Sequence, residues 1–191
     1  MAGTGTRHRK CSPGLVISII KQVEHPNDRG EIMAKTFTSR TSWRAKLERT
    51  DHSKVVEIPA SMAKRLGDGM MLIPKPLDVD ALIRKTKRGK LVTVSEIRSR
   101  LARDNNVDVA CPLTTGIFIR IAAEAAEEDL RNGKKQITPY WRVIRDDGSL
   151  NEKFPGGVRA QSQRLKQEGH RVSQGKGKPK VKDFEQSLMR L

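Results

Sequence analysis

The chain has 191 residues, with 38 Lys and Arg against 22 Asp and Glu, which gives a formal net charge of +16. This length allows one domain with a hydrophobic core plus tails, and the charge favours a polyanionic partner such as nucleic acid. The low aromatic content of 4% argues against a single-strand binder built on stacked bases. Two cysteines without metal-ligand spacing and the absence of a long apolar run exclude a disulfide framework and a membrane span.

The first residues differ in composition from the rest of the chain. Residues 1–32 are rich in Gly, Thr and Arg, and Met33 begins a stretch that looks like an ordinary translation start. The apolar run at 15–20 is too short for a signal peptide, and no small-residue cleavage site follows it. We therefore expect 1–32 to be a poorly ordered extension and 33–78 to be an arm that packs on the main domain.

Short elements are expected in the arm and at the start of the domain. Residues 40–52 predict a basic helix around Trp43 and Leu47, which are spaced i,i+4. Residues 55–59 read as extended, and residues 61–66 as one helical turn that stops at Gly67. Residues 70–76 are closed by two prolines and predict an edge strand or extended arm, and a helix follows at 78–85.

The central part predicts a helix-turn-helix. Thr93 and Glu96 have capping-box spacing, and the following helix is apolar on one face. A turn at 104–106 leads to Pro112, which suits the first position of a second helix. The second helix repeats apolar residues at i,i+4 and stops near Asn132 and Gly133. Two helices joined by a short turn on a basic chain are typical of helix-turn-helix DNA binders.

The remaining elements are a strand at 137–144, a turn at 146–148, a loop at 154–157 and a helix at 158–168 that ends at Gly169. Residues 173–191 are expected to be a basic C-terminal tail that is flexible at 174–180 and regains a turn of helix within 183–191.

Several of these segments, in this order, resemble the DNA-binding domain of the alkylguanine-DNA alkyltransferases (methylated-DNA–protein-cysteine methyltransferases) from residue 79 to residue 172. Residues 90–97 resemble the entry to the first helix, and residues 114–116 resemble the Ala-Val-Gly of the recognition helix. Asn132 matches the hinge Asn, and residues 139–144 match the active-site motif Pro-Cys-His-Arg-Val. Gly156 and Gly157 resemble the substrate-loop glycines, and Glu168 resembles the relay Glu.

The departures from the family pattern remove its chemistry. Tyr140 stands at the acceptor Cys, and Trp141 stands at the His that activates it. A phenol titrates near pH 10 and is a poor soft nucleophile, whereas a His-paired thiolate is a good one. Val94, Leu113 and Pro155 also replace a Tyr, an Arg finger and a Ser of the family. The chain therefore resembles alkyltransferase-like proteins, which keep the fold and bind lesions without the acceptor.

The resemblance implies a mainly α fold with a small β component, in the form of a winged helix-turn-helix. It implies a non-catalytic protein that binds double-stranded DNA, with alkylated guanine as the sensed lesion. No catalytic residue, metal or cofactor is expected; the partners are DNA and a repair-pathway protein, and the chain is a cytoplasmic, nucleoid-associated monomer. The expected DNA contacts are Lys87, Arg88, Lys90, Arg98, Leu113, Thr114, Thr115, Gly116, Arg120 and Arg142. The expected base pocket comprises Asn132, Pro139, Tyr140, Trp141, Phe154, Gly156, Gly157 and Glu168.

Simpler roles stay open for these residues. Tyr140 and Trp141 are also typical of a packed core, and Arg142 of a structural anchor. Arg120 can pair with Glu124 or Glu127 on its own helix, and the acidic end of that helix, at 127–129, is expected to face away from DNA. Two rival functions also stay open. One is alkyl transfer through a displaced acceptor, Cys111, and the other is protein binding through the helix at 112–131.

Overall fold

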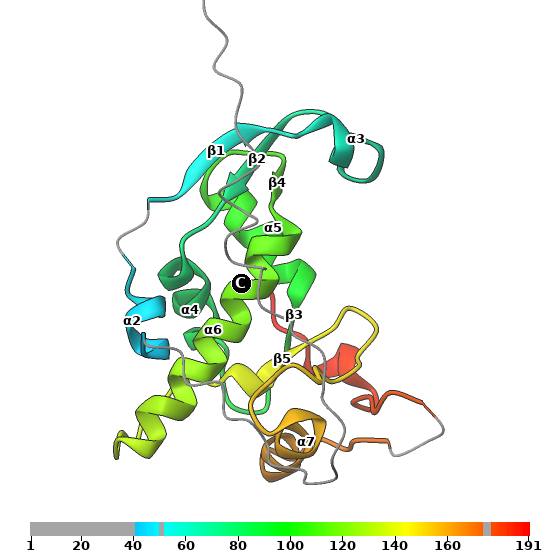
Figure 1. Ribbon diagram of the computed structural model, residues 1–191. Coiled ribbons are helices and arrows are strands. Elements are labelled where there is room, and N and C mark those ends of the chain that lie inside the picture. The colour runs from blue at the N-terminus through cyan, green and yellow to red at the C-terminus, as the bar shows by residue number, and fades with distance from the viewer. Residues whose placement is uncertain (1–40, 50–51, 174–176) are drawn as a thin grey trace, which may run out of the picture. The chain divides into compact units, whose positions relative to one another are not determined.

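The computed structural model describes residues 41–49, 52–173 and 177–191 (Figure 1). These residues form a mainly helical domain with two small β-sheets, as the sequence predicts. The expected N-terminal extension at 1–32 lies outside the described residues, as do the rest of the first forty residues, 50–51 and 174–176. Within the described part of the chain, no helix is both long and apolar enough to cross a membrane.

The larger sheet holds the strands β1 (Lys54–Glu57), β2 (Met70–Ile73) and β4 (Val109–Ala110) in the order β1-β2-β4. β1 is antiparallel to β2 with Val55 opposite Leu72, and β4 is parallel to β2. The prediction that β2 is an edge strand is wrong, because β4 pairs with its second side. The prolines that suggested an edge lie beyond Ile73, so they do not interrupt the ladder.

A short helix covers the outer face of this sheet. α3 (Ala60–Leu66) connects β1 to β2 and ends at Gly67, whose φ of +80° suits glycine. The small core under α3 is built around Ile58, Met71 and Cys111. The side chains that alternate with these on β2 point to the main core, where Leu72 is buried.

The main core lies among the helices. α6 (Pro112–Arg131) is the long helix, and α2 (Trp43–Leu47) and α4 (Pro76–Arg84) pack against it (Figure 1). α5 (Val94–Asp104) contacts α4, α6 and the larger sheet. The alanines of α6 at 122, 123, 125 and 126 are buried, which allows neighbouring elements to approach its backbone closely.

The capping box at the start of α5 forms only in part. The Oγ1 atom of Thr93 accepts a hydrogen bond from the backbone N of Glu96 at 3.1 Å, as predicted. The Glu96 carboxylate does not return to Thr93 but accepts hydrogen bonds from Arg103 and from the backbone N of Leu191. The Glu96 carboxylate, which the local pattern assigned to the cap, thus binds the backbone of Leu191 instead.

The predicted strand at 137–144 is mostly wrong. Residues Tyr140–Arg142 form the 3-10 helix η1, and only β5 (Val143–Ile144) is a strand, parallel to β3 (Val92–Thr93). Pro139 lacks a backbone N–H, so it cannot donate to a ladder, and the backbone N of Tyr140 already bonds to Thr138 O. α7 (Gly157–Gln167) follows close to the predicted position.

Residues 177–191 pack on the domain, so the flexibility predicted for 174–180 is wrong for its described part, whereas the predicted turn of helix within 183–191 is confirmed. They form isolated bridges from Lys180 to Ser149, Val181 to Val172 and Leu188 to Leu91, and they include the 3-10 helix η2 (Phe184–Ser187). Val181 is buried in the second core cluster with Leu91, Ile144, Leu150 and Leu165. The alternation of basic and apolar residues explains the error, because the apolar members pack while the lysines face solvent.

Candidate functional site

The first half of α6 presents a stripe of exposed residues, which we call the α6 stripe: Leu113, Gly116, Ile117 and Arg120. Their spacing of i, i+3, i+4 and i+7 places them on one helical face. Leu113 is 55% exposed and Ile117 is 39% exposed, so the face is apolar although it is open to solvent. At Gly116 no heavy atom of the described residues outside the helix backbone lies within 4 Å of where a Cβ would be, so this part of the helix can be approached closely.

Thr115 does not belong to this surface. Its side chain is fully buried, and its Oγ1 atom has no hydrogen-bond partner among the described residues. The expectation that Thr115 contacts DNA is therefore wrong, since the helical period turns it toward the core together with Ile119. Thr114 is half-buried, and its hydroxyl lies 3.4 Å from Cys111 O.

Tyr140 occupies the acceptor position as a buried, hydrogen-bonded phenol. It is 1% exposed, and its hydroxyl donates to Oε1 of Glu127 at 2.8 Å. Burial raises the pKa of the phenol, and the hydrogen bond to Glu127 raises this pKa further. Tyr140 also packs edge-to-face on Trp141 and on Phe154, with ring centroids 5.6 and 5.3 Å apart. This environment disfavours the phenolate that a nucleophile would need.

Glu168 joins three parts of the chain. Its carboxylate accepts hydrogen bonds from Trp141 Nε1 at 2.8 Å, from the Arg142 guanidinium at 2.9 Å and from the backbone N of Gly89 at 3.1 Å. Burial alone would raise the pKa of Glu168, but these bonds, with Arg142 first, outweigh it and hold the pKa below its usual value. Arg142 also donates to Thr86 O. These bonds give Arg142 the anchoring role that the sequence left open, and its contact with DNA stays a prediction.

Arg164 is the residue of this site that the sequence analysis missed. Its guanidinium lies over the Trp141 ring, 4.5 Å from the centroid, and pairs with the Glu127 carboxylate. Cation–π contact with Trp orients the guanidinium at the surface of α7. The only signal in the sequence was that Arg164 lies four residues before Glu168, and this spacing is too common to identify Arg164 as a site residue.

The residues of the expected base pocket do not line one cavity. Phe154 and Pro139 are buried, Gly156 and Gly157 form a left-handed turn at the start of α7, and Asn132 is exposed at the end of α6. A pocket of about 150 Å³ does lie beside Trp141. Of the expected set it includes only Trp141 and Glu168, and its other lining residues are Arg88, Arg164 and Gln167.

The expected phosphate contacts are divided between two places. One place is the loop at 87–90, which holds Lys87, Arg88 and Lys90. The backbone N of Gly89 in this loop donates to the Glu168 carboxylate, and Arg88 donates to Gln167 O at 3.4 Å. Arg98 instead donates to Ala110 O at 3.2 Å, next to the start of α6. Glu127, which contacts Tyr140, lies well down α6 from Leu113, a separation of roughly 20 Å at 1.5 Å per residue. The 87–90 loop therefore belongs with α7, away from the α6 stripe.

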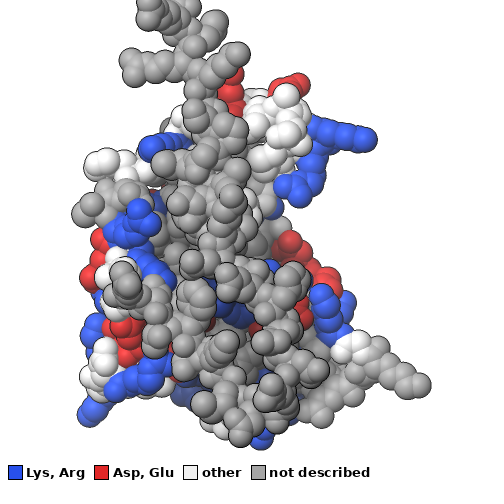
Figure 2. Space-filling model, viewed as in Figure 1, with Lys and Arg blue, Asp and Glu red and all other residues white. Residues whose placement is uncertain are grey.

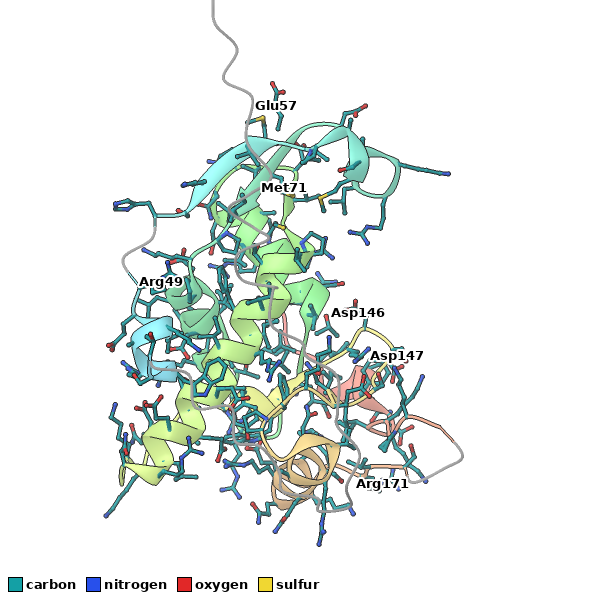
Figure 3. All side chains as sticks on the ribbon, in the orientation of Figure 1. Arg49, Glu57, Met71, Asp146, Asp147 and Arg171 are labelled. Atoms are coloured by element: carbon teal, nitrogen blue, oxygen red, sulfur yellow. The ribbon has the colours of Figure 1, made fainter. Side chains whose placement is uncertain are left out.

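The acidic end of α6 is used inside the domain. Glu127 holds Tyr140 and Arg164, Glu128 accepts from the backbone N of Arg44, and the buried Asp129 pairs with Arg44 and Lys134. Asp146 and Asp147 lie in the loop after β5 (Figure 3). This loop is also anchored, because Asp146 accepts from the backbone and hydroxyl of Ser95 and Asp147 from Ser149. These carboxylates do not form a separate acidic surface.

Cys111, the candidate displaced acceptor, is 6% exposed and precedes α6. It packs with Ile58 and Met71 in the core under α3. Among the described residues, no group of three His, Cys, Asp or Glu side chains is placed to hold a metal ion.

Two solved structures are similar to this chain. One is an S. pombe ATL in complex with DNA, at 17% identity and a TM-score of 0.44. The other is S. pombe Atl1 in complex with damaged DNA containing O6-carboxymethylguanine, at 19% identity and a TM-score of 0.41. Each match covers 61% of this chain and 94% of the other. No family model matches the sequence, and no curated protein matches it.

Proposed function

We propose that this protein binds duplex DNA through the α6 stripe and performs no reaction on it. The observation that carries the proposal is the exposed, apolar face of α6, with Leu113 at its start and Gly116 in its centre. Leu113 and Ile117 lie one helical turn apart, so they form one small apolar patch on this face. The net charge of +16 makes a polyanion the best-suited partner.

The stripe has the features of a minor-groove reader in a winged helix-turn-helix. α5 and α6 are the two helices, with β4 in the turn between them. Gly116 would allow the helix backbone to approach the DNA, and Leu113 would act as the apolar wedge at a base step. Arg120 at the end of the stripe would meet a phosphate, since its pairing with Glu124 is loose at 3.7 Å. Little sequence specificity is expected from the minor groove.

The state of Tyr140 supports a non-catalytic role. A phenol that is buried, donates to Glu127 and has a raised pKa is not a nucleophile at neutral pH. Cys111 is also buried and lies in a separate core cluster. Alkyl transfer through either residue is therefore not favoured.

The finer proposal is that the bound DNA carries alkylated guanine. It rests on the ordered resemblance of residues 79–172 to the alkyltransferases and on the altered motif at Tyr140 and Trp141. In this proposal the chain is a cytoplasmic, nucleoid-associated monomer that hands the lesion to a repair-pathway protein.

Fluorescence anisotropy with a labelled duplex tests both levels of the proposal. The dissociation constant should be micromolar or tighter at about 50 mM salt and should rise steeply as salt is added. Arg120→Gln should weaken binding, whereas the matched change Arg131→Gln, at the exposed far end of α6, should not. Absence of duplex binding at low salt would refute the proposal. Equal affinity for plain and O6-alkylguanine duplexes would refute only lesion sensing.

A further inference from the structure

A second basic surface lies on α7, apart from the α6 stripe. A groove of about 780 Å³ runs between α7 and the C-terminal segment, and its lining residues on α7 include Val158, Arg159, Gln163 and Lys166. Val172 and Pro179 form the opposite wall. Arg159 and Lys166 are the charged residues among its described lining, so no carboxylate there offsets them.

The groove adjoins the smaller pocket beside Trp141 through a shared residue, Gln167. Two further guanidinium groups, those of Arg88 and Arg164, line this pocket. Its carboxylate, Glu168, is already engaged by Trp141, Arg142 and Gly89. Arg88 has no carboxylate partner in the part of the chain that the structure describes. The groove and pocket together therefore carry an excess of positive charge.

We propose that this continuous surface, the α7 groove, binds a short stretch of single-stranded nucleic acid. Arg159, Lys166 and Arg88 would contact successive phosphates, and Val158 and Pro179 would contact sugars and base faces. The amides of Gln163 and Gln167 can donate to and accept from base edges. Trp141 would receive one base at the inner end, where its indole ring lines the pocket.

The size of the groove selects a strand over a duplex. Its volume falls within the range of about 300–1,000 Å³ that is typical of small-ligand sites. A duplex, whose major groove alone is about 12 Å wide, would lie across such a groove without entering it. A single strand can enter, because its phosphates and bases are not held in a helix. The site does not depend on a row of stacked bases, since one indole serves at one end and the phosphates supply most of the affinity.

Both walls of the groove are fixed before any ligand binds. The backbone N of Leu150 donates to Pro179 O at 3.0 Å, and Ser173 N donates to Lys180 O at 2.8 Å. On the α7 side, the buried Gln161 amide donates to Trp141 O and Val143 O. A preformed groove loses less conformational entropy on binding, which favours a specific site over diffuse attraction by surface lysines.

The test compares two double variants that remove the same charges. Arg159→Gln with Lys166→Gln changes the α7 groove, and Lys64→Gln with Arg65→Gln changes the last turn of α3, where basic side chains also project into solvent (Figure 2). Each pair is exposed and lies on a helix. The probe is a short fluorescent oligothymidylate, followed by anisotropy over a range of salt concentrations.

The groove variant should bind oligothymidylate at least tenfold more weakly, and the slope of log K against log salt should fall by about 1.4 for the two lost phosphate contacts. The α3 variant should behave as the unchanged protein. Duplex binding should be the same in both variants, so a failure of the duplex proposal is seen separately. Equal losses in both variants would overturn the groove proposal. The proposal would also fail if a labelled polyglutamate peptide bound the α7 groove and oligothymidylate did not displace it. The surface would then fit acidic proteins.

Discussion

The phenolic oxygen of Tyr140 lies 2.8 Å from Oε1 of Glu127, so the side chain at the acceptor position is hydrogen-bonded to the second half of α6. The same carboxylate pairs with Arg164, which lies over the Trp141 ring. Tyr140 and Trp141 are therefore connected through one residue of α6. Tyr140 is therefore part of a packed network, and of the aromatic pair only Trp141 lines a pocket.

The Tyr140 phenol is expected to resist titration in the folded protein. It is the only tyrosine in the chain, so the phenolate absorbance reports on it alone. Burial, and then the hydrogen bond to Glu127, raise its pKa above the usual value of about 10. The stabilisation is complete below the unfolded-state pKa and is lost as the pH rises above about 10, where only the unfolded chain ionises. Phenolate absorbance should therefore appear together with loss of helical circular dichroism; phenolate in a fully folded protein would contradict the burial.

Tyr140→Phe isolates the hydroxyl from the ring. The change removes one hydrogen bond to a carboxylate that keeps its pairing with Arg164, so the free energy of unfolding should fall by about 1.5 kcal/mol. Affinity for plain duplex should be unchanged, because the phenol is buried far along α6 from the stripe. Urea denaturation and anisotropy check the two parts. A loss of duplex affinity at unchanged stability would place Tyr140 at the DNA surface.

Glu168→Gln should destabilise the fold and alter its response to acid. The change leaves the half-buried Arg142 guanidinium without its carboxylate, which costs about 3 kcal/mol. The pKa of Glu168 is depressed, so its stabilisation is present above the unfolded-state pKa of about 4.3 and is lost as the pH falls through the lower folded-state value. As the pH falls from about 5 through the folded-state pKa of Glu168, the free energy of unfolding should therefore decrease less in the variant than in the unchanged protein. A parallel pH profile for both proteins would refute this account.

The helix pair α5 and α6 could be predicted from sequence because its signals are local. Thr93 caps α5, Pro112 begins α6, and the apolar period is read directly from neighbouring residues. Contacts between distant segments left no such pattern. The Arg164 guanidinium over Trp141, the 87–90 loop beside Glu168 and the packing of residues 177–191 depend on how the chain folds back on itself. The expectation that Thr115 contacts DNA came from the resemblance of residues 114–116 to the family. It did not take into account that the helical period turns Thr115 toward the core.

Thr115→Val tests that correction. Thr115 is fully buried with an unpartnered hydroxyl, and valine has a nearly equal shape without the polar atom. Because burying an unsatisfied hydroxyl is unfavourable, the free energy of unfolding should rise by up to about 1 kcal/mol. Duplex affinity should stay the same. A stable variant with weakened duplex binding would restore Thr115 to the interface.

Incubation with an O6-alkylguanine duplex should leave the mass of the intact protein unchanged. Tyr140 is a buried phenol, and Cys111 is 6% exposed within the core under α3. Intact-mass spectrometry followed by peptide mapping checks this prediction. A stoichiometric gain of one alkyl group on Cys111 would show that this core opens and that the displaced-acceptor function is real.

Gly116→Gln separates folding from DNA approach at the α6 stripe. The position is helical and exposed, and within the described ranges no heavy atom outside the helix backbone lies within 4 Å of an added Cβ, so the longer side chain meets no obstacle there. Glycine in a helix interior costs about 1 kcal/mol relative to good helix formers, so the variant should be as stable as the unchanged protein or slightly more so. The same side chain would hold the helix backbone away from a minor groove, and duplex affinity should fall by about tenfold, which corresponds to about 1.4 kcal/mol. Ser99→Gln, on the exposed face of α5, is the matched control and should leave duplex binding unchanged. If Gly116→Gln binds duplex as well as the unchanged protein, DNA does not approach this face of α6, and the proposed function loses the observation on which it rests.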